Sequence, residues 1–307
     1  MNGFINVYKP RGWTSHDMVG KLRRVLGIRK IGHTGTLDPN VDGVLLMAIG
    51  KATRLIEFLE NQDKLYRAQI VFGLSTDTED MTGEMTDRQD VSREQLDGFP
   101  ELLSRMTGEL RQVPPMVSAI RIDGKRLYQL ARQGTTVERP ARNVTVLETQ
   151  LIRPPYLDSD GWWKSEFTIL CSRGTYVRSY CRDLGSALGL PAVMGLLTRE
   201  AVGHHRLENS WSWENLQASV EEQRFDFLIP PESELGAMPG VMVPDNLVAR
   251  VCQGNMVALD QCRWRTPEPD NPEVPVAVYG PAGCLLAVGF RSGEDPDNLK
   301  MRKVFCN

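Results

Sequence analysis

Long apolar runs are missing from this 307-residue sequence. The longest, residues 44–49, is far shorter than the roughly 20 residues that a membrane-spanning helix needs. The first residues, MNGFINVYKPRG, also lack the basic-then-apolar pattern of a secretory signal. We therefore expect a protein of the cytoplasm that has no membrane partner.

The sequence also lacks the common cofactor motifs. It contains no phosphate-binding loop, no dinucleotide-binding fingerprint and no cluster of metal ligands. Its six cysteines form no C-x-x-C pair, so we interpret them as reduced, mostly buried thiols. His204 and His205 are adjacent, and we expect them to be structural rather than to share a metal ion. The sequence thus predicts neither a cofactor nor a metal site.

The charges are unevenly distributed along the chain. Residues 1–60 carry nine Lys or Arg and five Asp or Glu, a balance of +4, whereas residues 207–307 carry eight and fifteen, a balance of -7. The overall charge of -3 hides this difference, and a polyanion is expected to bind the early part of the chain. The candidate contacts to the phosphates of such a polyanion are five basic residues in or just after the first predicted helix: Lys21, Arg23, Arg24, Arg29 and Lys30. A solvated helix face is the alternative interpretation of these residues.

Hydrophobic spacing predicts both helices and strands. Residues 15–26 have helical spacing, with Ser15 as a plausible N-cap and Gly27 as a plausible stop. Alternation predicts a strand at residues 65–73, and a second helix is expected at residues 175–188. A helical insertion should follow the Gly83 turn, opened by a capping box at residues 92–95. Further extended segments are predicted at residues 116–122, 143–152, 162–171, 256–259, 274–279 and 285–290.

The segment 230–244 is dense in proline and glycine and predicts a domain boundary. We expect a larger domain at residues 1–235 and a small β-rich domain at residues 236–307.

Asp38 lies in the most informative stretch of the sequence, KIGHTGTLDP at residues 30–39. Pro39 biases the backbone of Asp38 towards an extended conformation. A short carboxylate on a constrained loop is suited to act as a nucleophile or a base. The simpler alternative is that Asp38 only caps a turn.

Five segments, in the same order, resemble the TruB family of pseudouridine synthases, which make pseudouridine 55 in bacterial tRNA. They run from about residue 4 to residue 203, and the family's catalytic aspartate falls on Asp38. Together they are far more specific than the Gly-His-Thr-Gly-Thr motif alone. The segments are residues 6–15, 30–43, 73–83, 114–124 with Arg126, Tyr128 and Arg132 after it, and 171–185.

The resemblance implies an α/β fold, with a long mixed, mainly antiparallel sheet flanked by helices and a small PUA-like RNA-binding domain after it. It implies an enzyme that isomerises uridine 55 in the T-loop of tRNA, after the base has been flipped out of its stack. The reaction breaks the N1–C1′ bond and joins C5 to C1′, so it needs no cofactor. The implied partner is the T-arm of tRNA. We expect no obligate protein partner and a monomer.

The resemblance also assigns roles to individual residues. Asp38, Tyr66 and Arg178 are the implied catalytic residues. Arg178 would hold Asp38 in a bidentate pair and keep it ionised. Tyr66 would form the pocket wall, although a core tyrosine is the alternative. The implied substrate-binding residues are His33, Tyr66, Tyr176, Leu197 and Lys9, of which Lys9 is expected to support the pocket rather than to react.

Some positions depart from the family pattern, and other functions remain open. Asp42 and Glu200 add negative charge where RNA would approach, which bears on target specificity more than on reaction type. One alternative is a chaperone that folds the T-arm without essential catalysis. Another is a phosphate- or nucleotide-binding transferase built on residues 32–36, although no Lys-Ser/Thr follows the glycines. The sequence leaves three roles open for the aspartate: attack at C1′, attack at C6 of the base, or removal of a ribose proton.

Overall fold

One long sheet organises the first two thirds of the chain. The computed structural model describes residues 1–118, 120–122, 124–127, 130, 135, 137–293 and 295–306, so Tyr128 and Arg132 lie outside the described residues. All strand pairs of this sheet are antiparallel except β12 with β3, which confirms a mixed, mainly antiparallel sheet. Its strands, in spatial order, are β1 (Gly3–Lys9), β3 (Asp42–Ile49), β12 (Ala192–Val202), β4 (Lys64–Phe72), β11 (Trp163–Cys171), β10 (Arg142–Leu157) and β7 (Gly108–Gln112), with β2 (Ile31–His33) on β3 and β13 (His205–Arg206) on β12.

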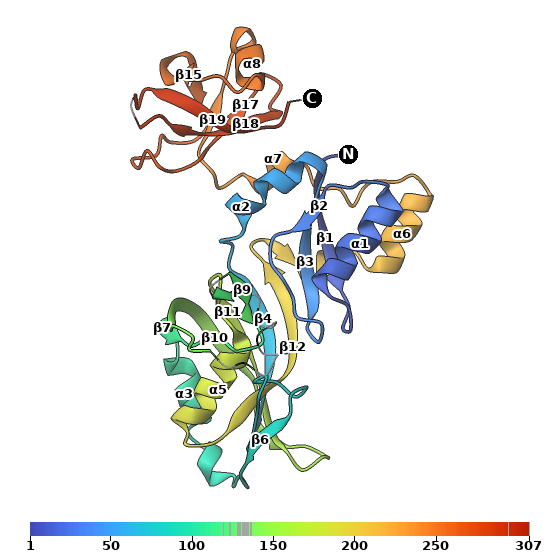
Figure 1. The fold of residues 1–307 in the computed structure, drawn as a ribbon, viewed down its shortest axis with the longest axis vertical. Helices are drawn as coiled ribbons and strands as arrows, with labels where there is room; N and C mark the ends of the chain where they lie inside the picture. The colour runs from blue at the N-terminus through green and yellow to red at the C-terminus, as the bar shows by residue number, and fades with distance from the viewer. Residues whose placement is uncertain are drawn as a thin grey trace.

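Helices flank this sheet at both ends, as Figure 1 shows. Near β1 lie α1 (Ser15–Leu26) and α6 (Trp213–Glu221), whereas α3 (Phe99–Arg105) and α5 (Val177–Ala187) lie beside the strands at the other end. Apolar residues of all four helices belong to one buried cluster with one face of the strands. The sheet is therefore a continuous support for loops that come from distant parts of the sequence.

Helix α1 shows how the local sequence determines an element. Its N-cap is Thr14, whose hydroxyl accepts from the backbone N–H of Asp17 at 2.9 Å while the Asp17 carboxylate accepts from the backbone N–H of Thr14 at 2.8 Å. The prediction of Ser15 as the cap is wrong by one residue, because the Ser15 side chain is buried and contacts the loop at Leu37 instead. Gly27 ends the helix in the left-handed conformation, as predicted.

Smaller elements complete the first part. Two hairpins, β5 (Leu74–Thr76) with β6 (Met85–Arg88) and β8 (Arg121–Ile122) with β9 (Lys125–Arg126), stand outside the main sheet. The predicted helical insertion after Gly83 is present as η2 (Glu94–Leu96) and α3. The remaining short helices are η1 (Gly50–Leu55), α2 (Ile56–Leu59), η3 (Leu207–Asn209) and α7 (Pro231–Glu234).

A second sheet forms from residue 240 onward and has its own apolar cluster with helix α8 (Asp245–Cys252). Another cluster joins this sheet to the first part, because Tyr279 and Leu285 pack with Phe4 and Leu46 on the opposite face of β1 and β3. The six strands, in spatial order, are β15 (Val257–Ala258), β19 (Asn298–Val304), β18 (Leu285–Arg291), β17 (Val276–Tyr279), β14 (Gly240–Met242) and β16 (Arg263–Trp264), with η4 (Leu259–Gln261) between β15 and β16.

The cysteines differ from the expectation of six free thiols. Cys252 at the end of α8 and Cys306 after β19 form a disulfide. The two cysteines are 54 positions apart, so no local sequence pattern predicts that they pair. Of the four free cysteines, Cys171 and Cys181 are buried, while Cys284 is exposed.

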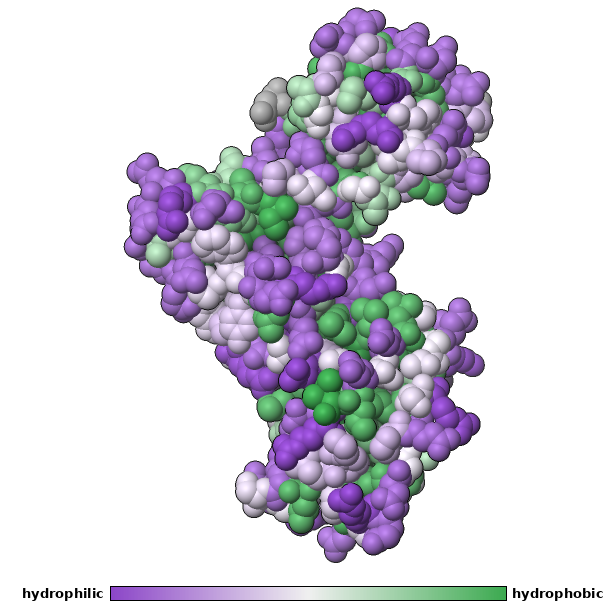
Figure 2. Space-filling view, turned by 180° about the vertical axis from the view of Figure 1, so that it is seen from behind, coloured by the Kyte–Doolittle hydropathy of each residue, from purple (hydrophilic) through white to green (hydrophobic). Residues whose placement is uncertain are grey.

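The outer surface is mainly polar, with apolar side chains in separate patches on the face that Figure 2 shows. On that face the outline is notched between the C-terminal sheet at the top and the rest of the chain (Figure 2). No helix among the described residues is long and apolar enough to cross a membrane.

Leu45 tests how strongly the first sheet depends on its core. It is fully buried in the centre of β3, so Leu45→Ala should lower the free energy of unfolding by about 2–5 kcal/mol through lost burial and a residual cavity. Leu157→Ala, at the exposed end of β10, is the control and should change it by less than about 0.5 kcal/mol. Urea unfolding of the variants measures both values, and equal losses would contradict this description of the core.

Candidate active site

A cavity of about 420 Å³ lies where β2, β4, β12 and the start of α5 come together. The loop of residues 34–41, here called the Asp38 loop, forms much of its wall. Segments far apart in the sequence supply the rest, and those at Ser118, Ile120 and residues 172–178 belong to segments with family resemblance. Its lining includes His33, Asp38, Tyr66, Tyr176, Arg178, Leu197 and Arg199.

Backbone and side-chain hydrogen bonds hold the Asp38 loop on both sides of the aspartate. The Ser15 hydroxyl accepts from the N–H of Leu37 at 2.9 Å and donates to the carbonyl of the same residue at 3.2 Å. On the other side, the N–H of Gly12 donates to the carbonyl of Pro39 at 2.8 Å. The position of Asp38 is therefore determined by helix α1 and the turn that precedes it.

Arg199 of β12 hydrogen-bonds to the backbone of the same loop. The sequence did not predict this residue. Its side chain is buried, and it donates to the carbonyls of Val44 at 2.7 Å, Gly35 at 3.2 Å and Thr36 at 3.4 Å. Gly43 permits this arrangement, because a Cβ there would lie 2.2 Å from the Arg199 carbonyl oxygen and its φ is +114°. The only signal in the sequence is its place two residues after Leu197.

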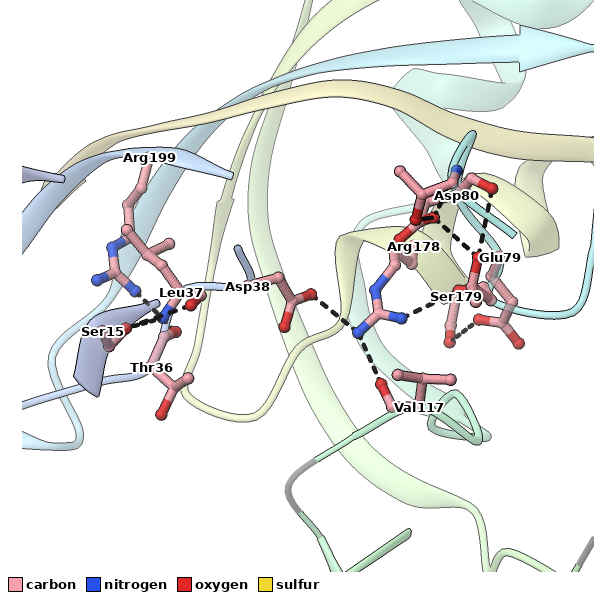
Figure 3. Close-up of polar contacts among 12 residues, drawn as sticks. Ser15, Thr36, Leu37, Asp38, Glu79, Asp80, Val117, Arg178, Ser179 and Arg199 are labelled. Carbon is pink, nitrogen blue, oxygen red and sulfur yellow. Dashed lines mark hydrogen bonds and ion pairs between the residues drawn. The ribbon is translucent and has the colours of Figure 1, made fainter. Parts of the chain in front are cut away.

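Arg178 lies directly opposite Asp38. Its Nη2 is 2.9 Å from Oδ2 of Asp38, and the same guanidinium donates to the carbonyls of Thr78 at 3.0 Å and Val117 at 2.9 Å, as drawn in Figure 3. The pair with Asp38 is not bidentate. Nη2 donates to Val117 as well as contacting Asp38, and Nη1 donates to Thr78. The Arg178 side chain is 4% exposed and that of Asp38 is 47% exposed. The carboxylate is therefore held by a buried cation while one side of it faces the cavity.

The loop that contains Thr78 is itself attached to helix α5. Glu79 accepts from the hydroxyl of Ser179 at 2.6 Å and pairs with Arg182, which also pairs with Asp183 at 2.7 Å. Figure 3 shows Glu79 and Ser179 beside the Arg178 guanidinium. Two of the resembling segments, residues 73–83 and 171–185, thus meet to position one arginine.

Tyr66 points from the middle of the sheet into the cavity. It lies on β4, opposite Arg199 of β12 and Ile169 of β11 in the strand register. Burial raises the pKa of the Tyr66 hydroxyl above its ordinary value, while the Arg199 guanidinium acts in the opposite direction. At neutral pH the side chain is therefore a neutral phenol that has both an aromatic face and a proton.

Tyr176 and Leu197 close the cavity from two other directions. Tyr176 is the N-cap residue of α5, and the buried side chain of Gln112 fixes its backbone by accepting from its N–H at 2.8 Å and donating to its carbonyl at 3.0 Å. Burial raises the pKa of the Tyr176 hydroxyl. Leu197 is 7% exposed on β12 and presents an apolar side chain to the same space. The walls thus combine two aromatic rings with an aliphatic side chain, which suits a flat base.

Two further cations or potential cations line the cavity. Burial, and next the Arg199 charge, lower the pKa of His33, and its Nδ1 atom has no hydrogen-bond partner in the part of the chain that the structure describes. Lys64, which the sequence analysis missed, donates to the carbonyls of Glu60 at 3.0 Å and of Gln62, and burial lowers its pKa to about 8. The only indication in the sequence would have been a lysine at the start of a strand, at a position where a buried apolar side chain is expected.

Lys9 supports the site without lining the cavity. Its side chain is fully buried at the end of β1, and Nζ donates to the carbonyls of Trp13 at 2.7 Å, Pro10 at 3.0 Å and Pro39 at 3.5 Å. Burial lowers its pKa to about 8. This agrees with a supporting position next to Asp38 and leaves the amine no access to the cavity.

The basic residues predicted to contact phosphates lie elsewhere. Lys21, Arg23, Arg24, Arg29 and Lys30 are in α1 or just after it, and none lines the cavity. Lys21 lies 4.1 Å from the centre of the Trp13 ring, and Arg23 donates to the carbonyl of Ile31 at 3.4 Å.

The two acidic residues that depart from the family pattern are both paired. Asp42 accepts from Thr198 at 2.6 Å, from Arg11 at 3.1 Å and from Tyr8 at 3.2 Å, and Glu200 pairs with Arg67 at 3.0 Å. Their charges are thus balanced within the protein rather than presented alone to a polyanion.

The fold and this site together define a class of protein. A carboxylate held by a buried arginine, in a cavity walled by tyrosines and an aliphatic residue on a mixed sheet, is suited to chemistry on a nucleobase and its ribose. Comparisons with known proteins agree. Residues 23–177 match the family model described as TruB family pseudouridylate synthase, N terminal domain.

Similar proteins cover nearly the whole chain. Two relatives named "tRNA pseudouridine synthase B" are 44% identical over 85% of both chains (Moorella thermoacetica) and 40% identical over 98% of this chain and 95% of the relative (Pelotomaculum thermopropionicum). A solved structure entitled "Crystal Structure of a Cbf5-Nop10-Gar1 Complex" is similar at 26% identity with a TM-score of 0.73, over 99% of this chain and 85% of that chain. The chain therefore belongs to the TruB family of pseudouridylate synthases.

Replacing Lys9 tests its buried position through pH. Because its pKa is about 8 in the folded state and 10.5 ordinarily, the unfolded chain binds more protons between these values, and stability rises with pH across this window through Lys9. Lys9→Met should remove this contribution, so the free energy of unfolding should rise less steeply with pH than in the wild type. Chemical unfolding at several pH values measures the slopes. Lys30→Met, at an exposed site, is the control and should keep the wild-type slope.

Proposed function

We propose that this chain is a tRNA pseudouridine synthase that isomerises uridine 55 in the T-loop, with Asp38 as the catalytic carboxylate. The observation that carries the proposal is the pair of Asp38 with the buried Arg178 at the wall of a cavity that also contains Tyr66. The family supplies the reaction type, and the names of the relatives at 40–44% identity support tRNA as the substrate.

The geometry suits a reaction in which the base is detached and rejoined. Asp38 would act at the sugar or the base while Arg178 keeps it oriented. Tyr66, Tyr176 and Leu197 would hold the flipped uracil after the N1–C1′ bond breaks, so that C5 can join C1′ before the base leaves. Once C5 has bonded to C1′, its proton must be lost, and N1 gains one, so atoms and electrons balance without a co-reactant.

The other expectations complete the proposal. His33 would contact the RNA, and the basic residues from Lys21 to Lys30 would contact phosphates of the T-arm. We propose a catalytic domain at residues 1–235 and an RNA-binding, PUA-like domain at residues 236–307. We further propose that the protein works as a monomer in the cytoplasm, where the Cys252–Cys306 disulfide would be unusual because that compartment keeps most thiols reduced.

Asp38→Asn tests the catalytic role. With tRNA carrying tritium at C5 of uridine, the wild type should release tritium from position 55 without added cofactor, and the variant should be slower by at least ~1,000-fold, as expected for loss of a catalytic group. Binding of tRNA by the variant, followed by filter retention, should persist. Asp87→Asn, on exposed strand β6, is the matched control and should react like the wild type.

The same experiment separates the enzyme from its alternatives. Wild-type protein that binds and refolds the T-arm but releases no tritium would favour the chaperone. Full turnover by Asp38→Asn would reject Asp38 as the catalytic group. Binding of ATP or GTP in calorimetry would favour the transferase.

Tyr66→Phe tests the hydroxyl apart from the ring. The variant keeps the aromatic wall, so tRNA affinity should change little, while turnover should fall by roughly 100- to 10,000-fold if the phenol takes part in proton transfer. Single-turnover tritium release and filter binding measure the two quantities. Tyr156→Phe, whose hydroxyl bonds Gln69 and Glu166 outside the cavity, serves as the control. Unchanged turnover in Tyr66→Phe would restrict Tyr66 to stacking.

A further inference from the structure

Three side chains able to bind a metal meet at the end of strand β12, outside the active-site cavity. Nε2 of His205 lies 2.9 Å from Oε2 of Glu234, and Nε2 of His204 lies 3.6 Å from Oε1 of Glu234. One ligand atom from each residue lies within 4.8 Å of the other two, and no other such group of three occurs among the described residues. No local sequence pattern predicts this group, because Glu234 comes 29 residues after His205.

The spacing of these atoms suits a small divalent ion. Two ligand atoms on a tetrahedral zinc ion, each about 2.0–2.2 Å from it, lie roughly 3.3–3.5 Å apart. The observed separations of 2.9 and 3.6 Å lie on either side of this range. The three side chains are therefore close enough to approach one ion, with each imidazole next to a different oxygen of the Glu234 carboxylate.

The buried carboxylate is a second, independent reason to expect a ligand. The Glu234 side chain is fully buried, and its Oε1 atom has no hydrogen-bond partner in the part of the chain that the structure describes. Burying a carboxylate without compensation is costly, so such groups are paired, hydrogen-bonded or bound to a metal. Oε1 faces the ring of His204, and an ion between them would satisfy it.

The ligand types favour zinc. Imidazole nitrogens and carboxylate oxygens are common zinc ligands, and two histidines with one carboxylate leave a fourth position for water. The side chain of His204 is 61% exposed whereas that of His205 is 5% exposed, so the open position would face solvent.

We propose that His204, His205 and Glu234 bind one Zn²⁺ ion that joins the turn after β12 to helix α7. This helix leads into the C-terminal sheet (Figure 1) and already contacts it, because Glu232 accepts from the N–H of Leu285 at 2.9 Å. The ion would thus stabilise the connection between the two sheets. This role is independent of the proposed tRNA activity.

Metal titration of the full-length chain tests this site. After removal of metal with a chelator, the wild type should bind one Zn²⁺ per chain and its melting temperature should rise, since the ion binds the folded state. His204→Ala changes an exposed side chain and should fold normally, and Glu234→Gln keeps the size of the buried side chain. Both should lower zinc affinity at least ~100-fold, because even outer partners of a ligand contribute 10- to 100-fold. His16→Ala, at an exposed histidine in α1, is the matched control and should bind zinc like the wild type.

Cobalt identifies the ligands. Co²⁺ in place of zinc should give visible absorption without the thiolate charge-transfer band that cysteine ligands produce, and His204→Ala should abolish it. Three results would overturn the proposal: no stoichiometric zinc binding by the wild type, undiminished binding by His204→Ala, or a thiolate band. The first would leave Glu234 paired with His205 alone.

Discussion

The contact between Asp38 and Arg178 is the interaction on which the rest of the site depends. Arg178 is almost completely buried, so its charge needs partners, and it finds them in one carboxylate and two backbone carbonyls. The carboxylate is half exposed and remains accessible from the cavity. Burying the cation rather than the anion holds the carboxylate in place without covering it.

This pairing requires an unusually well-supported loop. Ser15, Lys9 and Arg199 each bond to backbone atoms of the Asp38 loop, and they come from α1, β1 and β12. None of the three side chains touches Asp38 itself. Their effect is to fix the backbone on both sides of it, so that the aspartate has little freedom except that of its own side chain. The carboxylate is thus preorganised at the wall of the cavity.

Much of the first sheet is predictable because its signals are local, and strand alternation located β4. The site is different, because local pattern left Asp38 as a possible turn cap and only the family resemblance singled out Asp38, Tyr66 and Arg178, which all line the cavity. Arg199 and the Cys252–Cys306 disulfide were missed because each depends on partners distant in the sequence. Lys64 was missed because no local pattern shows that the start of β4 lines the cavity. In the C-terminal sheet, β14 has three residues and β16 has two, too few to show a period, so tertiary pairing rather than local pattern determines them.

Asp42, one of the departures from the family pattern, shows how neighbouring donors balance the charge of an added carboxylate. An aspartate at position 42 would repel a phosphate if it stood alone, and it lies close to the loop that positions Asp38. Here it accepts hydrogen bonds from Arg11, Tyr8 and Thr198, which come from the turn after β1, from β1 itself and from β12. The Asp42 carboxylate therefore joins three elements. Burial acts to raise its pKa, but the hydrogen bonds from these partners outweigh burial and hold the pKa below its ordinary value. What the sequence presents as an unfavourable charge becomes, in the fold, a further link between β12 and the segment next to the Asp38 loop.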